Sequence, residues 1–178
     1  MSDLRDLYEE VILDHNRHPR NYPKNPRGAN RHAHGFNPLC GDEVQVHLRV
    51  ADDVVRDVGF EGQGCAICMA SASLMTQAIM DRPVAEADAL FEAVREVLAG
   101  EEGGGGARSA RSARSGRGAV AAPGGATAEA GAEAAGRLGK LAVLAGVREY
   151  PMRVKCATLA WHTMRAALHG AGETVTTE

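Results

Sequence analysis

The stretch that decides the fold is "NPLCGDEVQVHLRV", residues 37–50, in which a loop with one cysteine leads directly into a strand pattern. Apolar and polar residues alternate along residues 43–50, with Val44, Val46, Leu48 and Val50 on one face. This period of two predicts a half-buried strand. Residues 54–60 predict a second strand after a tight turn near Ala51–Asp53, so the two segments should form an antiparallel hairpin.

Helical periodicity surrounds this hairpin on both sides. It predicts helices at residues 3–16, 66–80 and 84–98, a short helix at 138–146, and a last helix from Lys155 or Cys156 to His169. The proline-rich segment 19–39 predicts irregular chain, with a short edge strand near Arg31–His34.

Length and composition restrict the function. The 178 residues suit one domain with a hydrophobic core, and a net charge of −3 with 4% aromatics gives no basis for nucleic acid binding. The N-terminus lacks the features of a signal peptide, and no apolar run approaches the ~18 residues of a membrane span. We therefore expect a cytoplasmic protein with no membrane partner, whose cysteines stay reduced.

Residues 100–136 differ in composition from the rest of the chain. They contain eleven glycines, many alanines and no aromatic residue. Such a segment buries too little apolar surface to offset its ordering entropy, so it predicts a flexible insertion. Four arginines recur every third residue within it, at Arg108, Arg111, Arg114 and Arg117. They could form a basic docking strip, although a solvated low-complexity tract is the simpler interpretation.

Three cysteines are placed where a thiol can be reactive. Cys40 lies in the loop before the first strand, and Cys65 follows a glycine turn at the start of a helix. Cys156 is expected at the start of the last helix. A helix N-terminus favours thiolate through its unpaired N–H groups and its dipole, and so lowers the pKa of a thiol.

These cysteines and one carboxylate can form a metal site. Cys40, Asp42, Cys65 and Cys156 make a four-ligand set that suits tetrahedral Zn²⁺, with the aspartate as its weakest ligand. Spacing alone leaves a second interpretation open, in which two thiols are buried and inert and two lie in loops. In the "CAIC" motif, Cys68 could be a further thiolate, a redox partner of Cys65 or, as we favour, a small core residue.

The remaining polar candidates give weaker signals. Lys155 could compensate the charge of the thiolates or simply be an exposed lysine at the start of a helix. His47 falls on the polar face of its strand and is expected to be solvated, and no partner can be named for His32 and His34.

Several motifs resemble a known family. "LYEEVILDHNRHPRN", "NPLCGDEV", "FEGQGCAICMASASLMTQAI" and "VKCATLAWHT" are similar to the U-type iron–sulfur cluster assembly proteins, the IscU/NifU N-terminal family. "PMRVKCATLAW" resembles the SUF-system SufU branch, with Lys155 where the IscU branch has a histidine. Cys68 departs from the pattern of that branch, and the glycine-rich insertion is longer than expected.

The resemblance implies a fold, a site and partners. It implies one α+β domain over residues 1–178, SufE/NifU-like, with a small antiparallel sheet of about three strands and helices on one side. It also implies that Cys40, Asp42, Cys65 and Cys156 are the metal ligands. The implied partners are a PLP-dependent, SufS-like cysteine desulfurase and downstream SUF scaffold or apo-protein acceptors.

Two roles compete for these residues. In the first, the protein is a zinc-dependent sulfurtransferase, and Cys40 accepts persulfide sulfur after leaving the metal. In the second, it is a scaffold, and the same residues hold a transient [2Fe–2S] cluster. The histidine missing at Lys155 favours the first role. A structural zinc module or a cysteine hydrolase is a weaker third reading, since no convincing Cys–His pair is present.

Overall fold

The computed structural model describes residues 2–99, 138–170 and 174–177. In chain order the elements are α1 (Ser2–Arg17), β1 (Arg31–Asn37), β2 (Asp42–Ala51), β3 (Val54–Gln63), α2 (Ala66–Ile79), α3 (Val84–Ala99), the 3₁₀ helix η2 (Gly139–Val147), α5 (Pro151–Leu168) and β4 (Thr174–Thr176). The predicted insertion at 100–136 lies outside the described residues. None of the helices described is both long and apolar enough to cross a membrane.

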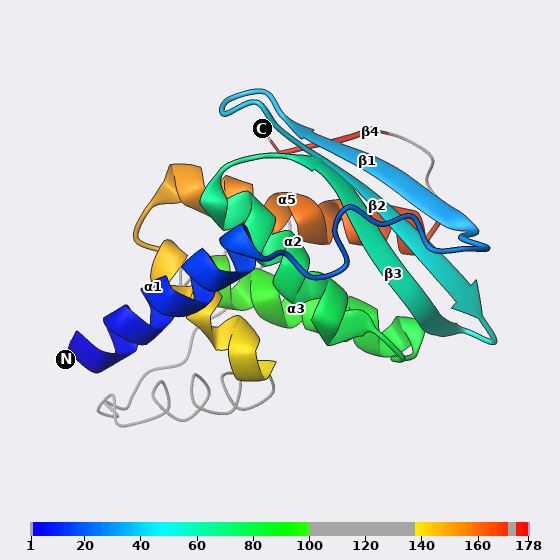
Figure 1. Ribbon diagram of the computed structural model, residues 1–178, viewed down its shortest axis with the longest axis horizontal. Coiled ribbons are helices and arrows are strands. Elements are labelled where there is room, and N and C mark those ends of the chain that lie inside the picture. The colour runs from blue at the N-terminus through cyan, green and yellow to red at the C-terminus, as the bar shows by residue number, and fades with distance from the viewer. Residues whose placement is uncertain (1, 100–137, 171–173, 178) are drawn as a thin grey trace, which may run out of the picture.

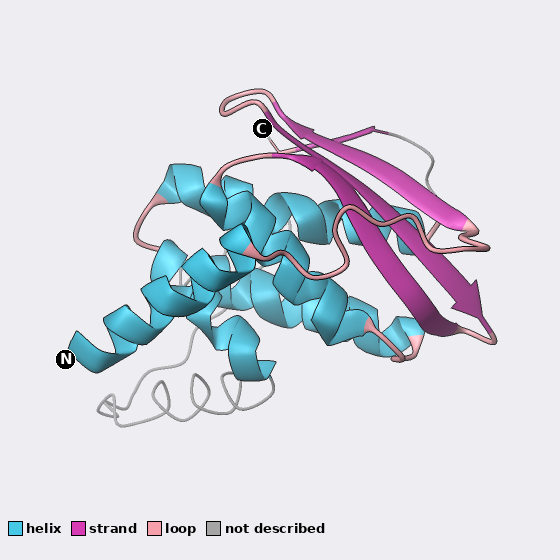
Figure 2. Cartoon of the chain, in the orientation of Figure 1, coloured by secondary structure: helices cyan, strands magenta, loops and turns pink. Residues whose placement is uncertain are grey.

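The strands form one sheet in the order β3-β2-β1-β4. β1 and β3 pair antiparallel with β2, and the short β4 pairs parallel with β1. Helices cover one face of this sheet (Figures 1 and 2), which confirms the predicted α+β class. The predicted edge strand near Arg31–His34 is longer than expected, and it is not an edge because β4 pairs with residues 34–36. β4 was missed because three residues are too few to carry a periodic pattern.

The turn of the hairpin follows from two aspartates. Ala51 pairs with Val54, so only Asp52 and Asp53 connect β2 to β3. Their φ angles are 53° and 56°, as a two-residue hairpin turn requires, and aspartate tolerates this region better than most residues. The turn sets the first two residue pairs, and a register shift between Arg49 and Val50 sets the pairing beyond them, in which Val44, Val46 and Leu48 point into the core.

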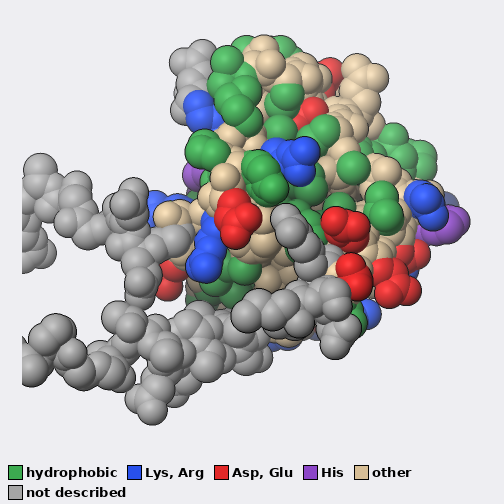
Figure 3. Space-filling model, turned by 90° about the vertical axis from the view of Figure 1, so that its left-hand side faces the viewer, with side chains coloured by type: hydrophobic (Ala, Val, Ile, Leu, Met, Phe, Trp, Pro, Cys, Tyr) green, Lys and Arg blue, Asp and Glu red, His purple; other side chains and the backbone are tan. Residues whose placement is uncertain are grey.

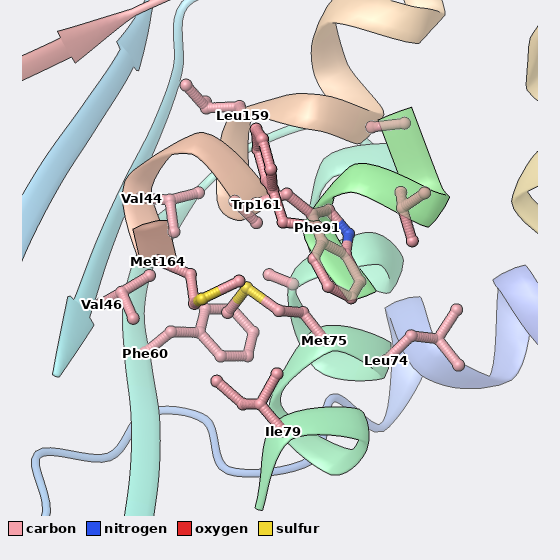
Figure 4. Packing of buried hydrophobic residues seen from close by; sticks show 14 of the residues in the cluster. Val44, Val46, Phe60, Leu74, Met75, Ile79, Phe91, Leu159, Trp161 and Met164 are labelled. Atoms are coloured by element: carbon pink, nitrogen blue, oxygen red, sulfur yellow. The ribbon is translucent and has the colours of Figure 1, made fainter. Parts of the chain in front are cut away.

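The core lies between the sheet and the helices α2 and α5 (Figure 4). Its largest side chains are completely buried and come from every layer: Val44, Val46, Leu48, Phe60, Met75, Ile79, Leu159, Trp161 and Met164. Burying one such side chain contributes about 1.5–3 kcal/mol, so this contact surface dominates the stability of the fold.

Two contacts fix α5 in position. A Cβ on Gly35 of β1 would lie only 2.0 Å from Thr163 Oγ1, so glycine at this position allows the helix to lie directly on the strand. Ser71 of α2 donates to the carbonyl of Ala157 at 2.6 Å and accepts from Trp161 Nε1 at 3.2 Å. These buried hydrogen bonds tie α5 to α2 next to Cys156, so the N-terminal parts of the two helices are held together.

The last helix begins at Pro151, which corrects the predicted start at Lys155 or Cys156. Tyr150 has an extended backbone and caps the helix, and Pro151 occupies its first turn. Proline is favoured there because the first N–H groups of a helix need no internal partner. Cys156 is therefore the sixth residue of α5, beyond the first turn.

Candidate metal centre

The loop between β1 and β2 carries Cys40 in a fixed turn. The buried side chain of Asn37 accepts from the Leu39 N–H at 3.0 Å, and its carbonyl accepts from the Gly41 N–H at 2.8 Å. Gly41 has a φ of +72°, a conformation that glycine adopts without strain. Cys40 lies between these two contacts as an exposed residue.

Asp42 is the buried residue that links the strand to α2. Only 2% of it is exposed. Its Oδ1 accepts from the Cys65 N–H at 2.9 Å, and its Oδ2 lies 3.6 Å from Cys65 Sγ. A Cβ on Gly64 would lie 3.1 Å from Asp42 Oδ1 and 3.0 Å from Cys68 Sγ, so glycine leaves the carboxylate room to approach.

Cys65 caps α2, as predicted. Its backbone is extended, with φ −65° and ψ 165°, and its sulfur accepts from the Cys68 N–H at 3.4 Å. The residue is exposed. The sulfur of Cys65 thus contacts both the start of α2 and the Asp42 carboxylate.

Cys156 has a different environment, which corrects the prediction that it shares the helix-start position of Cys65. It is buried, its thiol donates to the carbonyl of Met152 at 3.5 Å, and its sulfur lies 3.4 Å from that of Cys40. Burial raises the pKa of Cys156. The thiol is therefore stabilised as the neutral form by its own surroundings and requires a nearby positive charge to ionise.

The ligand atoms of Cys40, Asp42 and Cys156 all lie within 4.8 Å of one another. Cys65 is not part of this group, although its Sγ lies 3.6 Å from Asp42 Oδ2. In a tetrahedral zinc site, ligand atoms are roughly 3.6–3.8 Å apart, given metal–sulfur bonds of about 2.3 Å. The observed Sγ–Sγ and Sγ–Oδ2 separations of 3.4 and 3.6 Å are close to these values. Cys65 lies outside the group of three, so a four-ligand site requires its sulfur to move closer to the others.

The protonation state of the site also fits a cation. Cys40 is exposed as a residue, but its sulfur lies against Cys156 and Asp42. Burial raises the pKa of this thiol, and a hydrogen bond with Asp42 raises it further. With no cation, these surroundings favour the neutral form of both thiols. A divalent metal ion would supply the positive charge that turns both into ligands.

Comparison with known proteins identifies the family. Residues 7–157 match the family described as "NifU-like N terminal domain". The chain belongs to this family. It is 31% identical over 163 residues to the zinc-dependent sulfurtransferase SufU of Bacillus subtilis, covering 92% of this chain and 90% of that protein.

Two further relatives of the NifU-like N-terminal domain extend the comparison. The iron–sulfur cluster assembly scaffold protein IscU of Thermotoga maritima is 32% identical over 162 residues, covering 91% of this chain and 92% of the relative. A crystal structure assigned to a SUF-system scaffold protein of Fervidobacterium islandicum AW-1 superposes with a TM-score of 0.69 at 27% identity, covering 92% and 98% of the two chains. The fold expected from the motifs is confirmed.

Two residues outside the set of four ligands stand next to the site of this NifU-like domain. Cys68 is completely buried, which confirms the core interpretation, and burial raises the pKa of its thiol. It contacts the site through its N–H, which bonds to Cys65 Sγ. Lys155 is half-buried, and among the residues described no ion pair joins its ammonium group to a carboxylate. Its role as a charge partner of the thiolates stays a prediction.

Exposed apolar side chains, which the sequence did not reveal, lie on the two segments that carry Cys40 and Cys156, and we call them the apolar rim. The rim consists of Leu39, Tyr150 and Met152, which are 56%, 43% and 57% exposed. Leu39 precedes Cys40, and Met152 accepts the hydrogen bond of Cys156. Figure 3 shows this end of the molecule, where hydrophobic side chains gather with few charged ones between them near its top. An apolar surface around reactive groups is typical of a protein docking site.

Proposed function

We propose that this protein accepts sulfur from a PLP-dependent cysteine desulfurase for iron–sulfur cluster assembly, with zinc held by Cys40, Asp42, Cys65 and Cys156. The observation that carries the proposal is the convergence of Cys40, Asp42 and Cys156 within 4.8 Å, although Cys156 lies 116 positions from Cys40 in the chain. The similarity to the zinc-dependent sulfurtransferase of Bacillus subtilis supports zinc and the SUF pathway.

The four ligands would have different roles in the site. Zinc, when bound, supplies the positive charge that holds the thiols as thiolates. Cys65 and Cys156 belong to helices that Ser71 locks together, so they are the fixed ligands. Cys40 lies on an exposed loop and is the thiol that can turn toward a partner. Asp42 offers an oxygen among sulfurs, which makes its side of the site the easiest to open.

Sulfur transfer by Cys40 requires no external oxidant or reductant. The Cys40 thiolate attacks the outer sulfur of the persulfide on the desulfurase. A sulfur–sulfur bond forms on Cys40 while the bond between the two persulfide sulfurs breaks. The desulfurase cysteine leaves as a thiolate with the electron pair of that bond, and Cys40 keeps the persulfide.

The apolar rim of Leu39, Tyr150 and Met152 supports this partner. A persulfide on another enzyme reaches Cys40 only if the two proteins contact each other around that thiol. Tyrosine and methionine are enriched in such contacts. The rim provides three large side chains that would lose their exposure to water on docking. Its position beside Cys40 makes a desulfurase a fitting occupant.

A second role is supported by the scaffold proteins among the relatives. In that role, the same four residues would hold a [2Fe–2S] cluster as cargo and release it to an apo-protein. Lys155 favours sulfur transfer, since it cannot ligate iron where the IscU branch has a histidine. The two roles make different predictions for a desulfurase assay without iron.

The deciding experiment measures alanine production by a SufS-like cysteine desulfurase, with cysteine as substrate and no iron present. Zinc-loaded protein should raise the rate of alanine production at least several-fold. Transfer to Cys40 removes the outer sulfur from the desulfurase persulfide, so the desulfurase cysteine is free for the next turnover. Cys40→Ala should abolish the gain. Cys68→Ala is the matched control, since it removes a thiol buried beside the site and should retain most of the gain.

Metal analysis and reconstitution complete the test. Aerobically purified protein should contain about one zinc per chain. No stimulation by zinc-loaded protein would exclude sulfur transfer. A cluster formed anaerobically and passed intact to an apo-ferredoxin would then establish the scaffold role.

A further inference from the structure

The outer face of the sheet, opposite the helices, carries a second group of metal-binding side chains. His32 of β1 lies directly across from His47 of β2, and their Nδ1 atoms are 2.8 Å apart. The other ring nitrogen of His47, Nε2, is 3.2 Å from a carboxylate oxygen of Glu61 on β3. The sequence predicted a solvated His47. The structure corrects this, since His47 is only 7% exposed.

Glu61 determines which nitrogen of His47 carries the proton. A carboxylate accepts hydrogen bonds, so Nε2 of His47 is the donor in this contact. In the neutral ring, Nδ1 is then unprotonated, and its lone pair points at Nδ1 of His32. The contact between the two rings is thus either a hydrogen bond donated by His32 or, once that proton leaves, two lone pairs that converge on one point.

We propose that His32 and His47 bind a divalent metal ion of the class that prefers imidazole nitrogen, such as Zn²⁺, Ni²⁺ or Cu²⁺, with Glu61 as the positioning residue behind His47. The site is separate from the thiols. His47 lies five residues along β2 from Asp42, which corresponds to about 16 Å.

The geometry suits two neighbouring ligands of one ion. Two nitrogens that are each about 2.0–2.1 Å from a metal lie roughly 2.8–3.4 Å apart at bond angles of 90–109°. The observed 2.8 Å therefore requires a movement of at most a few tenths of an ångström. The hydrogen bond from a metal-binding histidine to a carboxylate also follows the usual pattern, because it fixes the tautomer and increases the basicity of the ligand.

Mobility and charge at the site are also favourable. His32 is exposed, so its ring can adjust and water can complete the coordination, whereas His47 is held by its burial. A second histidine–carboxylate pair lies on the same face, where His34 Nε2 is 2.8 Å from Glu43 Oε1. Glu61 and Glu43 each place a carboxylate beside a histidine on this face, and such a carboxylate favours a cation bound nearby.

The test is a zinc titration of the full chain, uniformly labelled with ¹⁵N, followed through the imidazole nitrogens by NMR. Before metal is added, the spectrum should show His47 protonated on Nε2. Zinc beyond the amount taken up by the thiols should shift Nδ1 of His32 and His47 together, with one common affinity. Because each histidine has its own signals, binding at Cys40 does not affect the reading.

Three variants make the test specific. His32→Gln changes an exposed side chain and should weaken this binding at least tenfold while abolishing the response of His47. Glu61→Gln should weaken it 10–100-fold, as expected for the carboxylate behind a metal-binding histidine. His18→Gln, in an exposed histidine at the end of α1, should leave it unchanged. The proposal is overturned if zinc shifts neither ring, or if the two rings respond with different affinities.

Discussion

Helices α2 and α5 each bring one thiol to the same end of the molecule, but the two sulfurs have opposite surroundings. Cys65 caps α2, is exposed, and accepts an N–H bond from Cys68. Cys156 lies beyond the first turn of α5, is buried, and donates to Met152. Burial favours the neutral thiol of Cys156. The site therefore combines an exposed ligand at a helix start with a buried ligand whose ionisation requires a nearby positive charge.

Asp42 and Cys40 lie between the two helical thiols. Asp42 is bonded to Cys65, and Cys40 is in contact with Cys156. The carboxylate and the loop thiol thus bridge a site whose helical ligands differ in exposure. Each prediction below changes one side of this arrangement.

The largest effect is expected for Asp42→Ala, which removes the bridge. Stimulation of the desulfurase should fall to background, while zinc should dissociate more slowly because only thiolates remain as protein ligands. A chelator competition measures the dissociation. The fold should lose about 1 kcal/mol, because the Cys65 N–H loses its acceptor.

Asp42→Asn is the control for this bridge, since its side-chain oxygen can still accept from the Cys65 N–H. This variant should have the free energy of unfolding of the unmodified protein, but it should not stimulate the desulfurase. If Asp42→Ala instead loses zinc and unfolds, Asp42 is a structural ligand and the idea of an easily opened side is wrong.

A smaller effect is expected when each helical thiol is replaced by serine and the changes in the free energy of unfolding are compared. In metal-free protein, Cys65→Ser should change the free energy of unfolding by less than about 0.5 kcal/mol, because serine is a preferred N-cap. Cys156→Ser places a hydroxyl in a buried position and should cost roughly 1–2 kcal/mol. Urea denaturation at pH 7 measures both. Equal losses would mean that the two environments do not differ in the way their contacts indicate.

The sequence predicted one of these environments and missed the other. At Cys65, the preceding glycines and the following apolar helix gave a clear boundary, and α2 begins within one residue of it. At Cys156, Pro151 was not recognised as a first-turn residue, so the helix was predicted to start too late. A proline both ends and begins helices, and only the extended backbone of Tyr150 decides between the two.

Contacts between distant segments account for the other omissions. Alternation predicted the hairpin, and motif similarity predicted the four ligands, but spacing alone could not bring Cys40 to Cys156. The contact between His32 and His47 depends on the register of β1 against β2, and no periodicity specifies that register. The apolar rim was missed for the same reason, since single exposed apolar residues carry no pattern.

The smallest expected effect is a pH dependence of stability that comes from two buried or half-buried histidines remote from the thiols, one on α1 and one on α5. His15 of α1 is 3% exposed, and its Nδ1 is 2.7 Å from Ser73 Oγ of α2. Ser73 Oγ accepts from the Arg20 N–H, so its own proton is free to be donated to an unprotonated His15. On α5, His162 is half-buried with its ring 5.1 Å from that of Phe91. Burial lowers the pKa of both histidines.

The direction of the pH effect follows from these pKa shifts. As the pH falls below about 6.5, the unfolded chain takes up protons that the folded protein still excludes from these two rings. The free energy of unfolding should therefore decrease from pH 7 to pH 5.5. His15→Gln should reduce this decrease more than His162→Gln does, because His15 is more deeply buried.

Urea denaturation at the two pH values measures these slopes. His18→Gln serves as the control because its side chain is 78% exposed, and it should follow the unmodified protein. If His15→Gln shows the unmodified slope while His162→Gln flattens it, the acid-sensitive anchor belongs to α5. The helix with the buried, cation-dependent thiol would then also be the one whose packing responds to pH.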